Sequence, residues 1–327
     1  MSERPSPRST FLAITGPTAS GKTAVSLQVA ARLGGEIISM DSRQIYRGMD
    51  VGTAKVTSAE RGSIPHHGLD LFDPSEAYSA GRFARDARRW IEDIRGRDRL
   101  PILVGGTGFF LRALMEPLFD EPPMEVGRRA ALRTFLEGLE TEDLAAWTQA
   151  LDPEAVPEVV RGGRQRMIRS ATVATLSGRP LSWWHAEQQR TGPSAEACSG
   201  LVVVLELPAD VLDERIANRV GRMIASGLVE EVEALVAAGY GRQSPGLTGT
   251  GYREVLDYLE GAVGLDEAME RIRIATRQYA KRQLTWFRNQ MPPEAVRVDG
   301  TQPTVVLADQ ILQAWRARLE DQQQRGD

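Results

Sequence analysis

The chain has 327 residues, 42% of them hydrophobic and 26% charged, which is ordinary globular composition and long enough for two domains or for one with a large insertion. A formal net charge of −4 weakly disfavours a nucleic-acid binder, although phosphate contacts depend on local basic patches rather than on the total. No apolar stretch reaches the roughly 20 residues of a membrane helix, and the single cysteine, Cys198, excludes an internal disulfide and a cysteine-rich zinc module, so we expect a cytoplasmic protein.

The N-terminal part of the chain carries a phosphate-loop motif. Residues 1–9 are polar and are expected to form a disordered tail, whereas the apolar run Phe11–Thr15 has the length of a strand. The motif Gly, four variable residues, Gly, Lys, Ser/Thr follows, and Ala24–Leu33 then shows helical spacing. Loop N–H groups and the helix dipole bind phosphate oxygens, Lys22 would reach the outer phosphate, and the Thr23 hydroxyl would hold Mg²⁺. The predicted diphosphate or triphosphate site consists of Gly16, Pro17, Thr18, Ala19, Ser20, Gly21, Lys22 and Thr23.

A second strand, Glu36–Met40, is followed directly by Asp41-Ser-Arg-Gln44. The carboxylate of Asp41 should stand at the carboxyl end of this strand, near the phosphate loop, where it can act as a general base or help to hold Mg²⁺. A helix N-cap is the alternative. The glycines of Arg47–Lys55 suit a loop that closes over a ligand, and its two cations suit phosphate. His66-His67 has no third ligand at metal spacing and is assigned a structural role.

Two further strand-like runs are Leu100–Val104 and Leu201–Leu207. Gly105-Gly-Thr-Gly108 follows the first run and offers backbone donors and a hydroxyl group. This strand lacks the terminal aspartate that many phosphate-loop NTPases use for Mg²⁺, which argues against a standard ATP hydrolase. All four runs are short and continuously apolar, as in parallel strands buried on both faces. We predict an α/β fold with a phosphate-loop-NTPase-like parallel sheet core and helices on both faces.

The alternation of strands and helices stops near residue 117. Residues 117–198 contain no clear strand and include helix-like segments at Arg129–Leu139 and Thr141–Leu151, so they are predicted to form a helical insertion domain. The two parts of the core would then be residues 10–116 and 199–318, the second mostly helical after residue 207. Residues 319–327 are polar and are expected to be disordered.

Basic residues gather in two clusters. Arg161–Arg169 has four arginines in nine residues, of which Arg166 and Arg169 would share a helix face. Arg271–Arg288 contains no acidic residue, and four of its cations fall within one arc of a helix. Both a polyanion-binding face and a solvated face remain open for this second cluster. The four cations are Arg273, Arg277, Lys281 and Arg288.

Three more arginines lie on the helix-like run Asp210–Gly227. Arg215 and Arg219 are four residues apart, and Arg219 and Arg222 are three apart. One of them could supply positive charge to a leaving diphosphate, as arginines do in phosphoryl transfer. Solvent exposure or pairing with nearby carboxylates is the alternative.

As an ordered set, these motifs resemble one family, the tRNA dimethylallyltransferases of the bacterial type, also called tRNA isopentenyltransferases. The resemblance spans about residues 11 to 290, and the order of the motifs makes it specific. The matching segments are Gly16–Thr23, Asp41–Lys55, His67–Asp70, Asp73–Pro74, Tyr78–Ala80, Val104–Gly108, Gln165–Arg169, Arg222–Leu228, Gly251–Glu254 and Thr276–Trp286.

The resemblance implies a reaction in which the dimethylallyl group of dimethylallyl diphosphate moves to N6 of the adenosine just 3′ of the anticodon. The phosphate loop would then hold the diphosphate of the prenyl donor rather than ATP. Mg²⁺, Thr23, Lys22 and Arg219 would stabilise the leaving diphosphate, and Asp41 would take the proton from the adenine amine. Because a stacked base cannot reach such a site, the adenosine should be flipped out.

The family alignment also assigns residues to roles. The resemblance implies that Asp41, Thr23 and Arg219 form the catalytic set and that Thr23 and Asp41 would be the Mg²⁺ ligands. The helical insertion would clamp the anticodon stem-loop, and the protein is expected to be a monomer that does not bind membranes. The residues expected to contact tRNA are Asp41, Ser42, Arg43, Gln44, Thr107, Arg128, Gln165, Arg166, Met167, Ile168, Arg169, Lys281, Arg282, Gln283 and Arg288.

Three rival functions stay open. An adenylate isopentenyltransferase would prenylate free nucleotide, but the second basic cluster and the long insertion favour RNA. A phosphate-loop kinase or NTP-driven switch is disfavoured by the missing strand-end aspartate, and a catalytically idle RNA-binding protein by the intact Lys22, Thr23 and Asp41. None of the departures from the family pattern affects Lys22, Thr23 or Asp41, although Gly162-Gly163 weakens the details of the expected RNA contact. The departures are Val56, Phe110, Gly162-Gly163 and Thr250.

Overall fold

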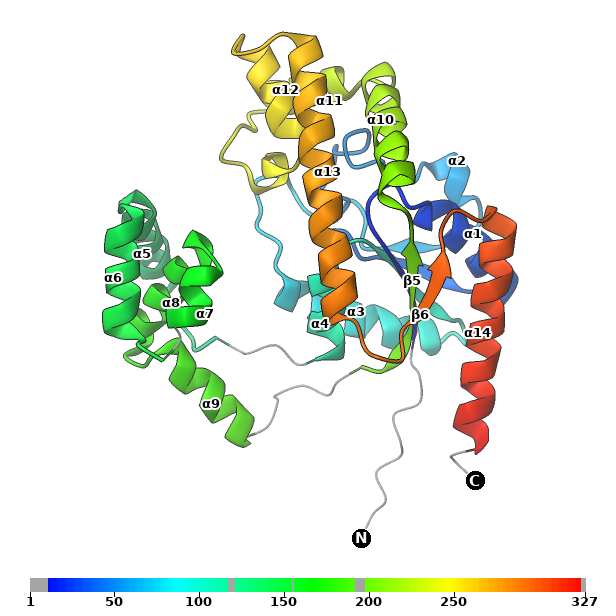
Figure 1. The fold of residues 1–327 in the computed structure, drawn as a ribbon, viewed down its shortest axis with the longest axis horizontal. Coiled ribbons are helices and arrows are strands. Elements are labelled where there is room, and N and C mark those ends of the chain that lie inside the picture. The colour runs from blue at the N-terminus through cyan, green and yellow to red at the C-terminus, as the bar shows by residue number, and fades with distance from the viewer. Residues whose placement is uncertain (1–10, 117–120, 155, 192–197, 325–327) are drawn as a thin grey trace. The chain divides into compact units, whose positions relative to one another are not determined.

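The computed structural model of this chain describes residues 11–116, 121–154, 156–191 and 198–324 (Figure 1). The chain divides into two compact units. The first combines the residues up to Glu116 with those from Ala197 onward, and the second is Pro117–Glu196. Each unit is described by itself below.

The first unit is built on a six-stranded sheet in which every pair of neighbours is parallel. The strand order is β3-β2-β4-β1-β5-β6, so the strand that precedes the phosphate loop lies centrally between β4 and β5. Every residue of β1 is buried, as expected for a strand with helices over both faces. The strands are β1 (Phe11–Thr15), β2 (Glu36–Ser39), β3 (His66–His67), β4 (Pro101–Gly105), β5 (Gly200–Glu206) and β6 (Val296–Asp299).

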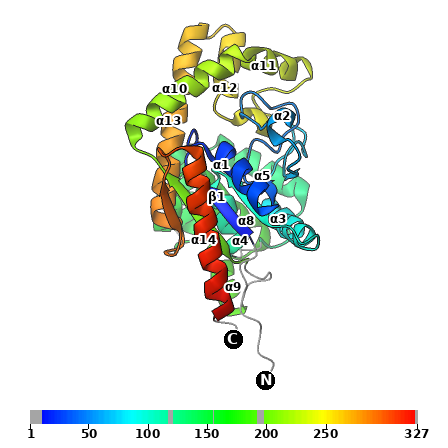
Figure 2. The same ribbon diagram turned by 90° about the vertical axis from the view of Figure 1, so that its right-hand side faces the viewer.

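Helices cover both faces of this sheet. On one face, α1 (Lys22–Leu33) and α14 (Thr304–Gln324) lie side by side (Figure 2). Their apolar side chains share a core with Leu12 and Ile14 of β1. On the other face, α3 (Ala80–Arg95) and α4 (Gly108–Met115) pack on each other and α3 packs on β2 and β4. Right-handed crossovers between parallel strands require this alternation of faces.

A second layer of helices follows β5 in the same unit. Its helices α10 and α13 pack on each other, and α12 packs on both α11 and α13. Their apolar side chains form one core with Ile45, Tyr46 and Met49, so the segment after β2 is anchored to this helical layer. The elements of this layer are α10 (Ala209–Ala225), α11 (Leu228–Ala237), the 3₁₀ turn η1 (Pro245–Thr248), α12 (Tyr252–Leu259) and α13 (Leu265–Gln290). The short helix α2 (Ser58–Arg61) lies earlier in the chain, between β2 and β3.

Among its described residues, the second unit contains helices and no strand. Its core includes Leu136, Leu144, Val159 and Ala171, contributed by four of its helices. A buried carboxylate, Asp152, accepts hydrogen bonds from both the N–H and the hydroxyl of Ser182 and so fixes the start of the last helix. The helices are α5 (Val126–Gly138), α6 (Thr141–Leu151), α7 (Val156–Arg161), α8 (Arg164–Ser177) and α9 (Leu181–Thr191).

The four strands read from the sequence are confirmed to within one residue at either end, and the sheet is parallel with helices on both faces. The edge strands β3 and β6 were missed. In β6, Val298 is buried while Arg297 and Asp299 are exposed, because an edge strand needs apolar residues on fewer sides than the central strands on which the search was based.

The expected disorder at the C-terminus is wrong for residues 319–324. Helix α14 continues to Gln324, because a helix already nucleated by the packing of Ile311 and Trp315 gains one hydrogen bond for each further residue at little cost. Residues 325–327 and the expected tail at 1–9 lie outside the described residues. Across the described chain, none of the helices has the length and apolarity needed to cross a membrane.

Candidate active site

Three loops meet at the carboxyl edge of the sheet. Because β2, β4 and β1 are neighbours, the segments that follow them adjoin: Asp41 after β2, Gly106 and Thr107 after β4, and the phosphate loop after β1. These segments line a cavity of about 150 Å³, together with Arg219 from α10 and with Tyr279 and Gln283 from α13. The predicted phosphate site is therefore assembled from three strand ends and two distant helices.

Two glycines of the phosphate loop have backbone conformations that favour glycine. Gly16 has φ 149°, and a Cβ there would lie 2.7 Å from the carbonyl oxygen of Leu205. Gly21 is the N-cap of α1 with φ 90°, and no side chain caps the helix. The first N–H groups of α1 are thus left for an anion at the mouth of the loop, where the helix dipole also favours negative charge.

Lys22 folds back over the loop. Its Nζ donates to the carbonyl oxygens of Gly16 at 2.9 Å and Pro17 at 2.6 Å, and to Ser20 Oγ at 3.3 Å. Burial and the nearby Arg219 lower the pKa of Lys22 to about 7, with Asp41 acting in the opposite direction. In the ligand-free protein this lysine is therefore about half protonated at neutral pH, and a bound polyanion would restore its proton.

Binding of inorganic diphosphate at pH 8 should take up about one more proton in the wild-type protein than in Lys22→Arg. At that pH the free lysine is mostly neutral and becomes charged on binding, whereas arginine is charged throughout. Titration calorimetry in buffers of different ionisation enthalpy measures the difference, and the ionisation of diphosphate itself cancels in the comparison. Equal proton uptake by the two proteins would contradict the lowered pKa of Lys22.

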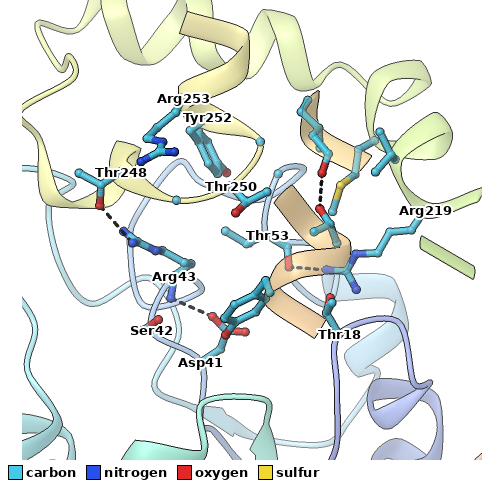
Figure 3. A pocket seen from close by; sticks show the side chains of 18 of the residues that line it. Thr18, Asp41, Ser42, Arg43, Thr53, Arg219, Thr248, Thr250, Tyr252 and Arg253 are labelled. Atoms are coloured by element: carbon cyan, nitrogen blue, oxygen red, sulfur yellow. Dashed lines mark hydrogen bonds between the residues drawn. The ribbon is translucent and has the colours of Figure 1, made fainter. Parts of the chain in front are cut away.

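Asp41 stands directly after β2 and is held by its own loop. Its Oδ1 accepts the N–H of Arg43 at 2.8 Å, and the N–H of Ser42 donates to Thr107 Oγ1 at 3.3 Å. The Arg43 guanidinium donates to the carbonyls of Pro245 and Gly246 and, at 3.1 Å, to the hydroxyl of Thr248 (Figure 3). The segment that carries the carboxylate is thereby attached to both the β4 loop and the η1 turn.

A second, larger cavity of about 370 Å³ adjoins the first. Four residues line both cavities, namely Thr18, Asp41, Arg219 and Tyr279. The lining of the larger cavity is mixed, since it includes apolar side chains of α10 and α13 as well as polar groups of residues 248–253. Asp41 thus lies where a phosphate-sized cavity opens into a space that can take an uncharged group.

Arg219 enters this junction from α10 (Figure 3). Its Nη2 donates to the carbonyl oxygen of Thr53 at 3.3 Å. Burial lowers the pKa of Arg219, Asp41 raises it and Arg222 lowers it, but a guanidinium remains charged at neutral pH. One turn earlier, Arg215 Nη1 donates to the carbonyl oxygen of Ser20 at 3.4 Å, so α10 presents two cations to the phosphate loop.

The structure also places Tyr279 of α13 in the site, where it lines both cavities. Burial and the carboxylate of Asp41 raise the pKa of Tyr279 to about 12, with an opposing contribution from a hydrogen bond with Thr107. It is therefore a neutral phenol beside Asp41. The available signal was its spacing, because Tyr279 and Gln283 are four residues apart and share a helix face.

Gln283 was expected to contact RNA, and the structure instead buries it. Its Oε1 accepts the N–H of Thr18 at 2.8 Å, and its Nε2 donates to the carbonyl of Gly106 at 2.8 Å. Both ends of the amide are thus used to join the phosphate loop to the β4 loop. Gly106 has no room for a Cβ, which would lie 2.3 Å from the Gln283 amide nitrogen.

The two cations of the Arg47–Lys55 segment do not serve a phosphate. Lys55 is buried and pairs with Asp50 at 2.6 Å and with Asp70, and it also donates to the carbonyl of Tyr46. Arg47 donates to the carbonyl of Leu71. The sequence suggested phosphate binding because the pairing carboxylates are brought to Lys55 only by the folded loop.

Two of the four cations on the basic face of α13 are paired with carboxylates. Arg273 pairs with Glu270 at 2.9 Å and Arg277 with Asp213 at 3.2 Å, so acidic residues outside the cluster neutralise two of its four cations. Lys281 and Arg288 are exposed, as is Arg282, which also lines the larger cavity. A polyanion would therefore meet the C-terminal part of the helix.

In the helical unit the structure separates the residues expected to contact RNA. Met167 and Ile168 are buried in the core, although Ile168 also lines a groove of this unit, and their contact with RNA stays a prediction. Arg128, Gln165, Arg166 and Arg169 are exposed. Within α8, the positions of the exposed Gln165, Arg166 and Arg169 around the buried pair follow the helical period.

A groove of about 200 Å³ on the helical unit is lined by basic and amide side chains together with Ile168, Thr172 and Val173. Glu121 pairs with both Arg129 and Arg169, and Gln165 accepts a hydrogen bond from Arg133. The groove therefore brings three arginines from two helices together with one carboxylate among them.

The site has few candidates for a metal ligand. Among the described residues, no three or more histidine, cysteine, aspartate or glutamate side chains are grouped as a metal site. Thr23 and Asp41 line the same small cavity and supply one hydroxyl and one carboxylate. β4 adds no carboxylate at its last position, since Gly105 lies against the backbone of Met40, where a Cβ would come within 1.9 Å of the carbonyl oxygen.

Comparisons with known proteins agree with this geometry. The chain matches the family described as IPP transferase over residues 44–290 and that described as isopentenyl transferase over residues 9–65. It is 42% identical over 313 residues to a tRNA dimethylallyltransferase of Geobacillus thermodenitrificans, covering 95% of this chain and 98% of the relative. A tRNA dimethylallyltransferase of Thermomicrobium roseum is 39% identical over 323 residues, covering 98% and 94%.

Solved structures are similar over most of the chain as well. The full-length tRNA isopentenylpyrophosphate transferase of Bacillus halodurans has a TM-score of 0.70 at 35% identity, covering 98% of this chain and 99% of that one. A eukaryotic dimethylallyltransferase acting on tRNA has a TM-score of 0.74 at 26% identity, covering 89% and 73%.

Proposed function

Because the chain belongs to the tRNA dimethylallyltransferase family, we propose that it transfers the dimethylallyl group of dimethylallyl diphosphate to N6 of the adenosine just 3′ of the anticodon in tRNA. The products would be N6-isopentenyladenosine and diphosphate. The observation that carries this proposal is the position of Asp41, which lines both the phosphate-loop cavity and the larger cavity beside it. A base at this junction can serve a nucleophile that attacks the carbon attached to a bound diphosphate.

The residues divide the reaction between them. The phosphate loop, Lys22, the free N–H groups of α1 and Arg219 would bind the diphosphate and stabilise the charge that develops on it. The C–O bond between the allylic carbon and the diphosphate breaks, and a C–N bond to adenine N6 forms. Asp41 accepts the proton that N6 loses. The neutral Tyr279 beside it adds no competing charge.

Thr23 and Asp41 would hold a Mg²⁺ ion. In phosphate sites this ion is commonly bound by one or two carboxylates together with substrate oxygens, and the donors that line the small cavity fit that pattern. When bound, it would neutralise part of the charge on the diphosphate. Lys22 and Arg219 would act on the same oxygens from the protein side.

The RNA would be bound by exposed cations of both units. We assign Lys281, Arg282 and Arg288 to the RNA near the site, and the exposed basic residues of the helical unit to the stem. Entry of the adenine into the larger cavity requires that it be flipped out of its stack. That the helical unit clamps the anticodon stem-loop, that the protein acts as a monomer and that it works in the cytoplasm remain predictions.

A direct assay tests the proposed function. The protein is incubated with dimethylallyl diphosphate, Mg²⁺ and an unmodified anticodon stem-loop that has adenosine 3′ of the anticodon. The mass of the RNA is then measured by mass spectrometry. A gain of one C₅H₈ on the RNA is expected, with no product from adenosine monophosphate in parallel. Prenylation of the mononucleotide alone would identify an adenylate isopentenyltransferase, and NTP turnover without either product would favour a kinase or switch.

A further inference from the structure

Glu231 of α11 places its carboxylate inside the loop that follows Met49. Oε2 accepts the N–H groups of Asp50 and Val51, both at 2.7 Å, and Oε1 accepts that of Gly52 at 3.1 Å. Three successive backbone N–H groups that converge on one point form an anion nest, which normally holds a ligand or a phosphate. Here an internal carboxylate from about 180 residues away fills it.

A fourth donor completes the surroundings of this carboxylate. The hydroxyl of Tyr252 donates to Glu231 Oε1 at 2.6 Å, and its ring is fully buried. Burial and the negative charge of Glu231 raise the pKa of Tyr252 far above its usual range, so it remains a donor. Gly52 is required for this contact, because a Cβ there would lie 2.6 Å from the Tyr252 ring.

The loop held by Glu231 leads directly to Arg219. Thr53 follows Gly52, and its hydroxyl donates to the carbonyl of Met49 at 2.7 Å. The Thr53 carbonyl oxygen accepts hydrogen bonds from Arg219 Nη2 and from Gln44 Nε2, each at 3.3 Å. The direction of the Arg219 guanidinium therefore depends on a carbonyl whose neighbour in the chain is fixed by Glu231.

We infer that Glu231 is a positioning residue for transfer: by filling the nest at residues 50–52 it fixes the Thr53 carbonyl and so aims Arg219 at the leaving diphosphate. This inference rests on the proposed function. Glutamine at position 231 would keep one oxygen but would direct an amide NH₂ group at a backbone donor, so the loop would lose one acceptor contact if the nitrogen replaced Oε1 and two if it replaced Oε2. Residue 231 does not line either cavity, so its effect must pass through the groups that it contacts, which are the loop at residues 50–52 and Tyr252.

A double-mutant cycle with Arg219 tests this inference. In the wild-type background, Glu231→Gln should lower kcat about tenfold and change the KM for dimethylallyl diphosphate less than about threefold. In the Arg219→Ala background, the same substitution should lower kcat less than about twofold. The matched control is Glu233→Gln, which removes the same charge from an exposed position of α11. Single-turnover mass spectrometry of the RNA gives the rates, and thermal unfolding shows whether each variant is folded.

The outcomes separate this inference from the proposed function. No product from the wild-type protein would end the proposed function itself. With an active wild type, the inference is overturned by an unchanged Glu231→Gln, or by an equal loss in both backgrounds. If Glu231→Gln does not fold, Tyr252→Phe replaces it in the test, because this variant removes one donor from the same carboxylate. A decrease of kcat by about threefold that is absent in the Arg219→Ala background supports the inference, and an equal decrease of kcat in both backgrounds overturns it.

Discussion

Asp41→Asn is expected to lower the rate of dimethylallyl transfer about 10³-fold, within the range of a lost general base. Asparagine keeps an oxygen that can accept the N–H of Arg43, so the loop geometry at 2.8 Å is retained. It cannot take a proton from the adenine amine. The loss should therefore be found in the single-turnover rate of RNA modification, whereas the affinity for the RNA changes little.

The control for this variant is Asp266→Asn, which removes an exposed carboxylate from the first turn of α13 and should leave the rate unchanged. If Asp41→Asn retained more than about a tenth of the wild-type rate, proton transfer to Asp41 would not limit the reaction. The remaining role of the carboxylate would then be that of a Mg²⁺ ligand. A Mg²⁺ titration of the variant distinguishes that role, because a lost ligand raises the Mg²⁺ concentration needed for half-maximal rate.

Arg219→Ala is expected to cost about 10³-fold in kcat, similar to the loss of an arginine that stabilises a leaving phosphate group. The guanidinium lines both cavities and is held at the Thr53 carbonyl, so it lies where the C–O bond must break. The KM for dimethylallyl diphosphate should rise much less than kcat falls, because the phosphate loop and Lys22 still bind the ground state.

Arg222→Ala is the matched control for Arg219, since it removes an exposed cation one turn further along α10. It should leave kcat within about twofold of the wild type. Arg219→Lys should recover part of the lost rate, because lysine restores the charge but not the fork of donors. A tenfold rise in KM with no change in kcat would instead make Arg219 a binding residue only.

The parts of the site that the sequence predicts are those encoded by contiguous residues. The phosphate loop is one octapeptide between a strand and a helix, and Asp41 follows its strand directly. For such motifs, the local chain determines both the backbone and the direction of the functional group. Arg219 was one of three candidates at helical spacing, and choosing among them required the family resemblance.

The remaining features depend on partners that are distant in sequence. Gln283 lies 265 residues from Thr18, and the Glu231 carboxylate meets a loop about 180 residues earlier, so no local pattern reveals either contact. Lys55 was misread partly for the same reason, since it pairs with Asp50 of its own segment and also with Asp70, which only folding brings near. The helical period of α8 distinguishes the buried Met167 and Ile168 from their exposed neighbours, and the motif-based assignment did not use this period.

Consecutive residues of helix α13 face solvent and the phosphate loop, respectively. Lys281 and Arg282 face the solvent, whereas Gln283 is buried and holds the Thr18 amide and the Gly106 carbonyl. A helix is stiff over a single turn. A polyanion that binds Lys281 and Arg282 would therefore affect the phosphate loop through the amide side chain of Gln283. Coupling free energies are reciprocal, and a filled loop would in turn alter the hold on the polyanion. Under the proposed function, α13 would couple the binding of the two substrates, and the affinity for each should be measured in the presence of the other.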